Sequence, residues 1–321
     1  MPSSKSFPVK LVITLGDPSG IGPEITAKAL SCLKPKTEII IVGDKWVFNK
    51  ARKAGRIAGN IRFIDLNNVS RRNFSFGKIK PEYGRASIEY LEKALELIGN
   101  KEADALVTCP ISKEAASLSG FAYSGHTEYL LAKTKSQYSV MMLLNNYLKI
   151  SLVTTHIPIS EVPSRINKQK IIKTIILTHS SLKNLFGIKN PRVVVCGINP
   201  HASDNGLIGS EENKIIKPAL SLVKKSFKGV EGPMPSDTAV AKAMQGYYDA
   251  VIAMYHDQAL IPLKLSDPKS GVNITLGLPF VRTSPLHGTA FDIAGSAKAD
   301  PASLVQAIKL AAICQSNLKR D

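Results

Sequence analysis

The chain has 321 residues, of which 44% are hydrophobic and 21% charged. This composition is typical of a globular protein and too apolar for a disordered one. No apolar run approaches the roughly 18 residues of a membrane-spanning helix, and the first ten residues, MPSSKSFPVK, lack the apolar stretch of a secretory signal. Four scattered cysteines without a CxxC pair favour reduced thiols in a cytoplasmic protein over a disulfide framework.

The charge balance is strongly basic, with 42 Lys and Arg against 25 Asp and Glu and a formal net charge of +17. Such an excess attracts nucleic acids, anionic lipids or phosphorylated small molecules. Aromatic residues make up only 6% of the chain and do not alternate with basic ones, so platforms for base stacking are poorly supported. We therefore expect a small anionic partner, with no nucleic acid and no membrane.

Strand-like and helical segments alternate along the chain. Short apolar runs predict strands at residues 11–15, 38–42, 61–64, 105–108, 140–144, 150–154, 192–196 and 250–254. Helical patterns occupy residues 23–33, 85–98, 168–185, 211–225 and 303–314, and Asn167 is a candidate cap for the third. This alternation predicts an α/β architecture with a mainly parallel sheet. Because no low-complexity linker interrupts the chain, we expect two lobes that share strands and hold a ligand cleft.

The first motif is GDPSGIGPE, residues 16–24, which follows a predicted strand and opens a predicted helix. Its glycines let the backbone approach a ligand, and a helix N-terminus favours negative charge. Its spacing, GxxxGxG, matches neither the Rossmann motif nor a Walker loop. A tight strand-to-helix turn also requires glycine, so the motif indicates a ligand loop and a structural turn equally well.

Three histidines follow three predicted strands: His156, His201 and His256. In open α/β sheets the carboxyl ends of parallel strands carry the ligand site. The separations of 45 and 55 residues match no local zinc signature, but the fold can bring distant histidines together around a cation. Each histidine alone is more simply an unrelated loop or capping residue. Because all three share one context, we favour a three-histidine metal site.

Two further segments contain many polar groups. Residues 124–128, SGHTE, begin a predicted helix and indicate either an anion site or an ordinary cap. Residues 255–295 combine many charged and polar side chains with glycines and prolines, which is typical of functional loops. Within this region Lys264, Asn273 and Arg282 would make a clamp for a phosphate or carboxylate.

Taken together, seven segments resemble the 4-hydroxythreonine-4-phosphate dehydrogenase family of vitamin B6 biosynthesis. They are GDPSGIGPEI, SGHTEYL, TTHIP, GINPHA, YDAVIAMYHDQ, GVNITLGLPF.RTSP and HGTAFDIAG, which occur in order along nearly the whole chain. A fainter similarity links the first and last segments to isopropylmalate and isocitrate dehydrogenases. This resemblance implies their two-lobed α/β fold with a central cleft, not a Rossmann domain. The expected lobes are residues 1–131 with 277–321, and residues 132–276, the second lobe dimerising.

The resemblance also implies an activity: oxidation of the C3 hydroxyl of 4-phosphooxy-L-threonine by NAD or NADP, followed by loss of CO2 to give 3-amino-2-oxopropyl phosphate. Family members are homodimers with the active site at the subunit interface, and they use one divalent metal ion, here zinc, magnesium or cobalt. The implied metal ligands are His156, His201 and His256. The implied substrate contacts are His126, Thr127, Lys264, Asn273 and Arg282.

The remaining roles stay open. Candidates for proton transfer are Asp237, Asp257 and Lys264, and candidates for cofactor contacts are Asn199, His287 and Asp292. The sequence departs from the family after His201, where ASDNGLIG replaces a glycine-rich turn, at Leu286, where aspartate is commoner, and at residues 295–298. These departures bear on the expected cofactor and metal loops and leave the three histidines in place.

Three alternative functions remain. Relatives with the same motifs oxidise four-carbon sugar-acid phosphates, such as erythronate or threonate 4-phosphate, or a dihydrodiol dicarboxylate, and the same clamp would bind those anions. The net charge of +17 keeps a nucleic-acid-binding protein as an alternative of another class. A catalytically inactive scaffold is disfavoured because the histidines and clamp residues are retained.

Overall fold

The computed structural model describes residues 9–33, 37–52 and 59–319, so the expectation about the first ten residues falls largely outside it. The chain divides into two compact units. Unit 1 comprises Met1–Lys135 and Pro279–Asp321, and unit 2 comprises Ser136–Leu278.

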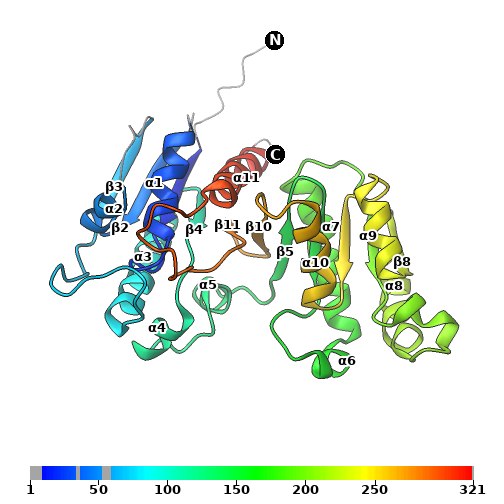
Figure 1. The fold of residues 1–321 in the computed structure, drawn as a ribbon. Coiled ribbons are helices and arrows are strands. Elements are labelled where there is room, and N and C mark those ends of the chain that lie inside the picture. The colour runs from blue at the N-terminus through cyan, green and yellow to red at the C-terminus, as the bar shows by residue number, and fades with distance from the viewer. Residues whose placement is uncertain (1–8, 34–36, 53–58, 320–321) are drawn as a thin grey trace, which may run out of the picture. The chain divides into compact units, whose positions relative to one another are not determined.

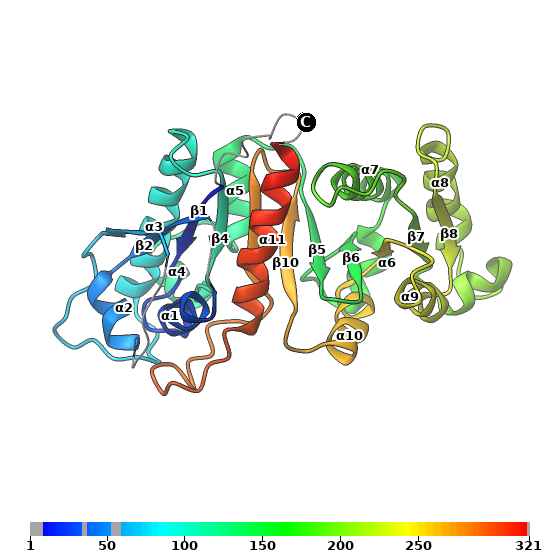
Figure 2. The same ribbon diagram turned by 90° about the horizontal axis from the view of Figure 1, so that it is seen from above.

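Unit 1 has five mutually parallel strands in the order β3-β2-β1-β4-β11. Helices α1 and α11 pack on one face of these strands and α3 on the other (Figures 1 and 2). Leu11, Val12 and Ile13 of β1 are fully buried, as expected for a strand covered on both faces. The strands are β1 (Lys10–Thr14), β2 (Glu38–Gly43), β3 (Ile61–Asp65), β4 (Ala105–Thr108) and β11 (Val281–Pro285). The helices are α1 (Gly22–Cys32), α2 (Lys45–Ala51), α3 (Pro81–Gly99), α4 (Lys113–Leu118), α5 (His126–Thr134) and α11 (Ala302–Leu318).

Unit 2 has the strand order β10-β5-β6-β9-β7-β8. The β10–β5 and β5–β6 pairs are antiparallel, whereas β6, β9, β7 and β8 run parallel. Helix α7 covers one face, and α9 and α10 cover the other (Figure 2). The strands are β5 (Val140–Leu144), β6 (Lys149–Leu152), β7 (Val193–Cys196), β8 (Val230–Met234), β9 (Ala250–Ala253) and β10 (Val272–Leu276). The helical segments are η1 (Ile159–Glu161), α6 (Val162–Arg165), α7 (Lys168–Asn184), η2 (Pro200–Gly206), η3 (Glu212–Ile216), α8 (Lys217–Val223), α9 (Ser236–Met244) and α10 (His256–Ser266).

The α/β class and the mainly parallel pairing are confirmed, and so is the cap of α7, where the Asn167 side chain accepts a hydrogen bond from the Lys170 amide at 2.9 Å. The interpretation of residues 255–295 as loops is wrong for much of their length, because α10, β10 and β11 lie there. Strand β8 was also missed. Gly232 and Pro233 are uncommon within strands, so β8 was not recognised. Polar residues interrupt the apolar pattern of β10 and β11. Among the described residues, no helix is both long and apolar enough to cross a membrane.

Candidate functional site

The GDPSGIGPE loop is held by backbone contacts that only glycine permits. Gly16 has a φ of 68°, and a Cβ there would lie 2.2 Å from the Pro110 carbonyl oxygen. A Cβ on Gly22 would lie 2.0 Å from the Leu15 carbonyl oxygen. These two glycines are therefore required by the turn between β1 and α1.

The loop also buries a carboxyl group that sequence reasoning did not single out. Asp17 is fully buried, and its Oδ1 accepts a hydrogen bond from the Ser19 amide at 2.9 Å. Its Oδ2 has no hydrogen-bond partner in the described part of the chain. Burial disfavours the charged carboxylate and raises the pKa of Asp17 to about 6.

A second buried carboxylate in unit 1, Glu24, fastens the segment that follows the HGTAFDIAG motif. Glu24 accepts hydrogen bonds from the amides of Ala297 at 3.3 Å and Ala299 at 3.0 Å. The Lys28 ammonium lies 2.9 Å from Glu24 and donates to the carbonyls of the same two alanines. Glu24 and Lys28 thus hold the segment that contains Ala297 and Ala299 against the start of α1.

Unit 1 brings two predicted substrate-binding residues into electrostatic contact. His126 begins α5, as the sequence predicted for this segment, and Arg282 lies in β11, only 3% exposed. The Arg282 guanidinium donates to the Thr108 hydroxyl, at the end of β4, at 2.7 Å. Burial and the neighbouring Arg282 charge hold the pKa of His126 well below its usual value. Burial lowers the pKa of Arg282 to about 10, opposed by the Glu128 carboxylate.

This arrangement pairs a neutral imidazole with a permanent cation at neutral pH. The Nε2 atom of His126 is buried without a hydrogen-bond partner among the described residues. Because buried polar atoms are nearly always hydrogen-bonded, this atom indicates a place where a bound ligand supplies the hydrogen bond. An anion is the ligand that a buried guanidinium would stabilise. Thr127 follows His126 on α5 and is half-buried.

Unit 2 places the three predicted metal ligands after three parallel strands, as expected. His156 follows β6, His201 lies in the turn η2 after β7, and His256 begins α10 after β9. The rings of His156 and His256 lie 5.4 Å apart between centroids, tilted by 45°. Within the described ranges of this single chain, no group of three His, Cys, Asp or Glu side chains is arranged to hold a metal ion.

The pair nevertheless has the chemistry of a metal site. The Nδ1 atom of His256 lies 2.6 Å from the Asp257 carboxylate. Metal-ligating histidines commonly donate one ring N–H to a carboxylate, which orients the other nitrogen toward the cation. Asp257, predicted as a proton-transfer residue, thus contacts a predicted metal ligand.

The remaining predicted residues lie as follows. In unit 2, Lys264 is exposed on α10, Asn273 is half-buried in β10, and Asp237 is exposed in the first turn of α9. Burial, and to a smaller extent the Asp237 charge, raises the pKa of the Cys196 thiol at the end of β7. In unit 1, Asp292 is exposed. The half-buried His287 places Nδ1 3.1 Å from the Gly288 carbonyl oxygen, and burial lowers its pKa.

Asn199, predicted to contact the cofactor, uses its side chain within the protein. Its Nδ2 donates to Glu211 at 2.8 Å and to Glu212 at 2.9 Å. Glu212 is fully buried and was missed by the sequence reasoning. The sequence signal for this residue was the pair of acidic residues at 211–212, but acidic residues are also common at an ordinary helix start.

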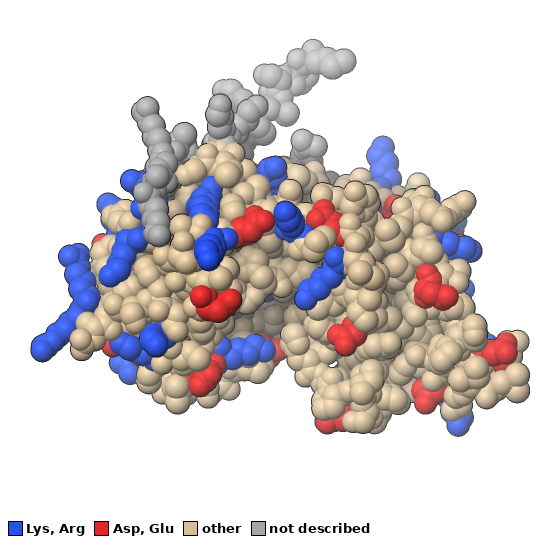
Figure 3. All heavy atoms as spheres, in the orientation of Figure 1, with Lys and Arg blue, Asp and Glu red and all other residues tan. Residues whose placement is uncertain are grey.

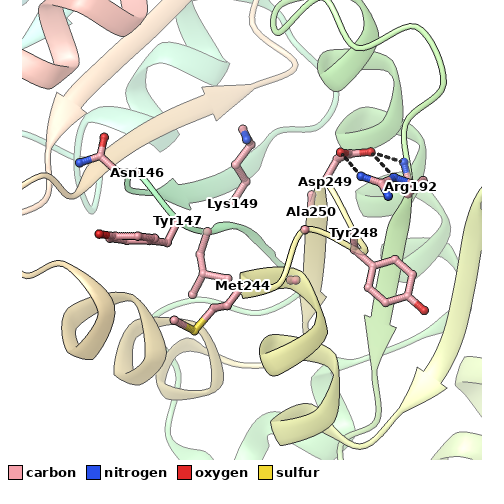
Figure 4. Close-up of a pocket in the computed structure, with 11 residues that line it drawn as sticks. Asn146, Tyr147, Lys149, Arg192, Met244, Tyr248, Asp249 and Ala250 are labelled. Atoms are coloured by element: carbon pink, nitrogen blue, oxygen red, sulfur yellow. Dashed lines mark hydrogen bonds and ion pairs between the residues drawn. The ribbon is translucent and has the colours of Figure 1, made fainter.

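A pocket of about 270 Å³ lies away from the histidines, at the opposite, amino-terminal edge of the same strands (Figure 4). Lys149 begins β6, Arg192 precedes β7, and Asp249 precedes β9. Figure 4 shows the Asp249 carboxylate facing the Arg192 guanidinium, with a nitrogen–oxygen distance of 3.0 Å. Because the Arg192 guanidinium is paired with the Asp249 carboxylate, we do not take this pocket as the candidate site.

Comparison with known proteins places the chain in a family. The model for "Pyridoxal phosphate biosynthetic protein PdxA" matches residues 19–311. A 4-hydroxythreonine-4-phosphate dehydrogenase from Sulfurihydrogenibium sp. is 46% identical over 316 residues, covering 94% of this chain and 97% of the relative. A protein from Oceanobacillus iheyensis, named provisionally as a D-threonate 4-phosphate dehydrogenase, is 41% identical and covers 92% and 95%.

The fold agrees with these matches. The crystal structure of 4-hydroxythreonine-4-phosphate dehydrogenase from Klebsiella pneumoniae superposes with a TM-score of 0.85 at 34% identity, covering 98% of this chain and all of that one. The resemblance seen in the sequence motifs is therefore confirmed. The chain belongs to the PdxA family of pyridoxal phosphate biosynthetic proteins.

Proposed function

We propose that the chain is an oxidoreductase that converts 4-phosphooxy-L-threonine to 2-amino-3-oxo-4-phosphooxybutanoate with NAD or NADP. The substrate C3–H leaves as hydride to the nicotinamide, and the hydroxyl loses its proton. The β-keto acid then loses CO2 to give 3-amino-2-oxopropyl phosphate. Family membership across residues 19–311 is the observation that carries this proposal.

The unit 1 residues fit an anionic substrate. Arg282, with a pKa of about 10, stays charged at neutral pH in a buried position, where a cation and a phosphate or carboxylate attract strongly. His126 stays neutral because burial lowers its pKa, so it can donate or accept a hydrogen bond without adding charge. We assign substrate contacts to these two residues, together with Thr127, Lys264 and Asn273.

We propose that His156, His201 and His256 hold one divalent metal ion. The 5.4 Å separation of two of these rings and the Asp257 contact of His256 support this assignment. Zinc and cobalt suit imidazole ligands better than magnesium. When bound, such an ion acts as a Lewis acid that lowers the pKa of a coordinated hydroxyl.

Three further assignments belong to the proposal. His287 and Asp292 are offered as cofactor contacts. A homodimer through unit 2 is supported by Ile261 and Leu265, which lie one turn apart on α10 and are 59% and 81% exposed. A cytoplasmic location fits the four free cysteines, because reduced thiols persist in that compartment.

Oxidation of D-threonate or erythronate 4-phosphate is the second candidate function, favoured by the name of the Oceanobacillus relative. Nucleic-acid binding has weaker support, because on the face shown in Figure 3 Lys and Arg are dispersed and interspersed with Asp and Glu.

The test is a substrate comparison with the full-length protein, a divalent metal and NAD. We expect NADH absorbance with 4-phosphooxy-L-threonine and a much lower kcat/KM with D-threonate or D-erythronate 4-phosphate. The reverse order would establish the second candidate, and no turnover with any of these phosphates would reject both.

A further inference from the structure

Three neighbouring strands of unit 2 each lead into a segment that carries one of the proposed metal ligands. The strands stand in the order β6-β9-β7 and lead to His156, His256 and His201 respectively. The backbone at these strand ends is joined by a buried polar network, which we define as Thr154, Gln258 and Glu212. All three side chains are at most 9% exposed.

Thr154 and Gln258 tie the first two segments together. The Thr154 hydroxyl donates a hydrogen bond to the Met254 carbonyl oxygen at 2.6 Å. Thr154 lies two residues before His156, and Met254 lies two residues before His256. The Gln258 Oε1 atom accepts from the Met254 amide at 2.6 Å. The His156 and His256 segments therefore share one backbone anchor, Met254.

Gln258 also extends this anchor to the third segment. Its Nε2 donates to the Gly197 carbonyl at 2.9 Å, directly after β7. A single side chain, two residues after His256, thus bridges the His256 segment and the chain that leads to His201.

Glu212 fixes the next two residues of that chain. Its Oε1 accepts from the amides of Ile198 and Asn199, both at 2.8 Å, and its Oε2 accepts from the Asn199 side chain at 2.9 Å. Hydrogen bonds to a buried carboxylate are among the stronger ones in proteins. The backbone is therefore firmly held up to two residues before His201.

The turn beyond this anchor is strained. Residues 201–205 all have positive φ values, between 42° and 69°, and none of them is glycine. Left-handed backbone is sterically unfavourable for residues that carry a Cβ, least so for Asp and Asn. Strain of this kind persists only where surrounding contacts over-determine the conformation, and the carboxylate of Glu212 supplies such contacts at the start of the turn.

We propose that Gln258 and Glu212 are positioning residues that hold the strand ends leading to His156, His201 and His256 in place and thereby raise the affinity for the divalent metal. This inference rests on the proposed function, because it assumes that the three histidines bind a cation. Neither side chain is assigned a contact with the metal or the substrate. Changes in outer-shell partners of this kind typically weaken metal binding about 10- to 100-fold.

Two variants test the network. Glu212→Gln retains an oxygen for the two backbone amides but places an amide nitrogen against the Asn199 nitrogen, so one hydrogen bond is lost. Gln258→Met keeps the length of the side chain and loses both of its hydrogen bonds. The matched control is Asp249→Asn at the opposite edge of the same strands, where Asp249 also accepts from a backbone amide, that of Arg192, at 2.8 Å (Figure 4).

The measurement is titration of metal-free, full-length protein with Co2+, following the visible absorption of the bound ion, with circular dichroism as the check on folding. We expect the Kd to rise about 10- to 100-fold in Glu212→Gln and Gln258→Met, with a changed absorption band, and to stay at the wild-type value in Asp249→Asn.

The outcomes separate the inference from the proposed function. If the wild-type protein binds no Co2+, the metal assignment fails and the inference fails with it. If the wild type binds and both folded variants keep its Kd, the inference alone is overturned. An equal loss in Asp249→Asn would also overturn it, because general destabilisation would then explain the effect. If Glu212→Gln does not fold, the Kd of Gln258→Met decides.

Discussion

Removing the Glu24 carboxylate should destabilise unit 1 without reaching unit 2. Glu24 is 2% exposed and accepts hydrogen bonds from two backbone amides and from the Lys28 ammonium. Glu24→Ala leaves those amides in a buried place without their acceptor. It also removes the counter-charge of Lys28, whose side chain is 33% exposed.

The magnitude follows from these contacts. Removing one partner of a fully buried ion pair costs about 3–5 kcal/mol, and the partial exposure of Lys28 reduces that cost. We therefore expect Glu24→Ala to lower the free energy of unfolding by about 3 kcal/mol. Lys28→Met, which keeps the apolar stem, removes three hydrogen bonds and the counter-charge of the buried Glu24, which keeps its two amide donors. It should lower the free energy of unfolding by about 2 kcal/mol. The double variant should lose less than the sum of the two single effects, because part of the Lys28 contribution is its contact with Glu24.

The assay is urea unfolding followed by tryptophan fluorescence. Trp46 is the single tryptophan of the chain and lies in α2 of unit 1, against the ring of Phe74. Its signal therefore reports on the unit that contains Glu24. A loss below about 1 kcal/mol in Glu24→Ala, the range of an ordinary surface change, would refute the reasoning, as would strictly additive effects of the two substitutions.

Four further predictions concern strained or buried groups. Ser203→Gly should raise the thermal midpoint by roughly 2–4 °C in a melting experiment, because Ser203 has a φ of 69° and a buried hydroxyl without a partner among the described residues. Wild-type unit 1 should lose stability as pH rises from about 4 through about 6, because the folded pKa of Asp17 is raised to about 6; Asp17→Asn should remove that loss and, at pH 8, be more stable than wild type by about 1–3 kcal/mol, and an unchanged pH profile of unfolding would count against it. His126 acts in the opposite sense, since its folded pKa is lowered: its contribution is present above about pH 6.5 and lost as pH falls below that value, and His126→Gln should flatten this acid limb in the same fluorescence assay. Arg282→Lys should raise KM for the phosphorylated substrate about 10- to 100-fold, the equivalent of one charged hydrogen bond, and unaltered steady-state kinetics would remove Arg282 from the substrate site.

The sequence predicted the fold where a single pattern was sufficient. The buried strands β1, β2 and β9 are continuous apolar runs, and Asn167 is a standard cap, so local rules identified them. The placement of His156, His201 and His256 after three parallel strands also followed from local context, because each one closely follows an apolar strand.

Other parts depended on tertiary contacts. Arg282 sits in a strand at 3% exposure because Thr108 and the neighbouring Glu128 charge accommodate it, whereas a charged residue between glycine and proline reads as loop. Strand β10 was missed for the same reason, since Asn273 interrupts its apolar pattern. No local pattern identifies a polar residue whose partner lies more than a hundred positions away.

Two buried glutamates, Glu24 and Glu212, were likewise not identified from the sequence. Glu24 in the first turn of α1 holds the amides of Ala297 and Ala299, and Glu212 at the start of η3 holds those of Ile198 and Asn199. Each unit therefore uses one desolvated carboxylate to fasten a loop proposed to serve the site. Both loops include segments, residues 202–209 and 295–298, in which we noted a departure from the pattern that the resemblance implies. A carboxylate that binds backbone amides does not depend on the side chains of the loop, because every residue except proline has the same backbone N–H donor. The same two carboxylates would therefore hold loops of a different sequence, provided that no proline replaces a residue whose amide they bind.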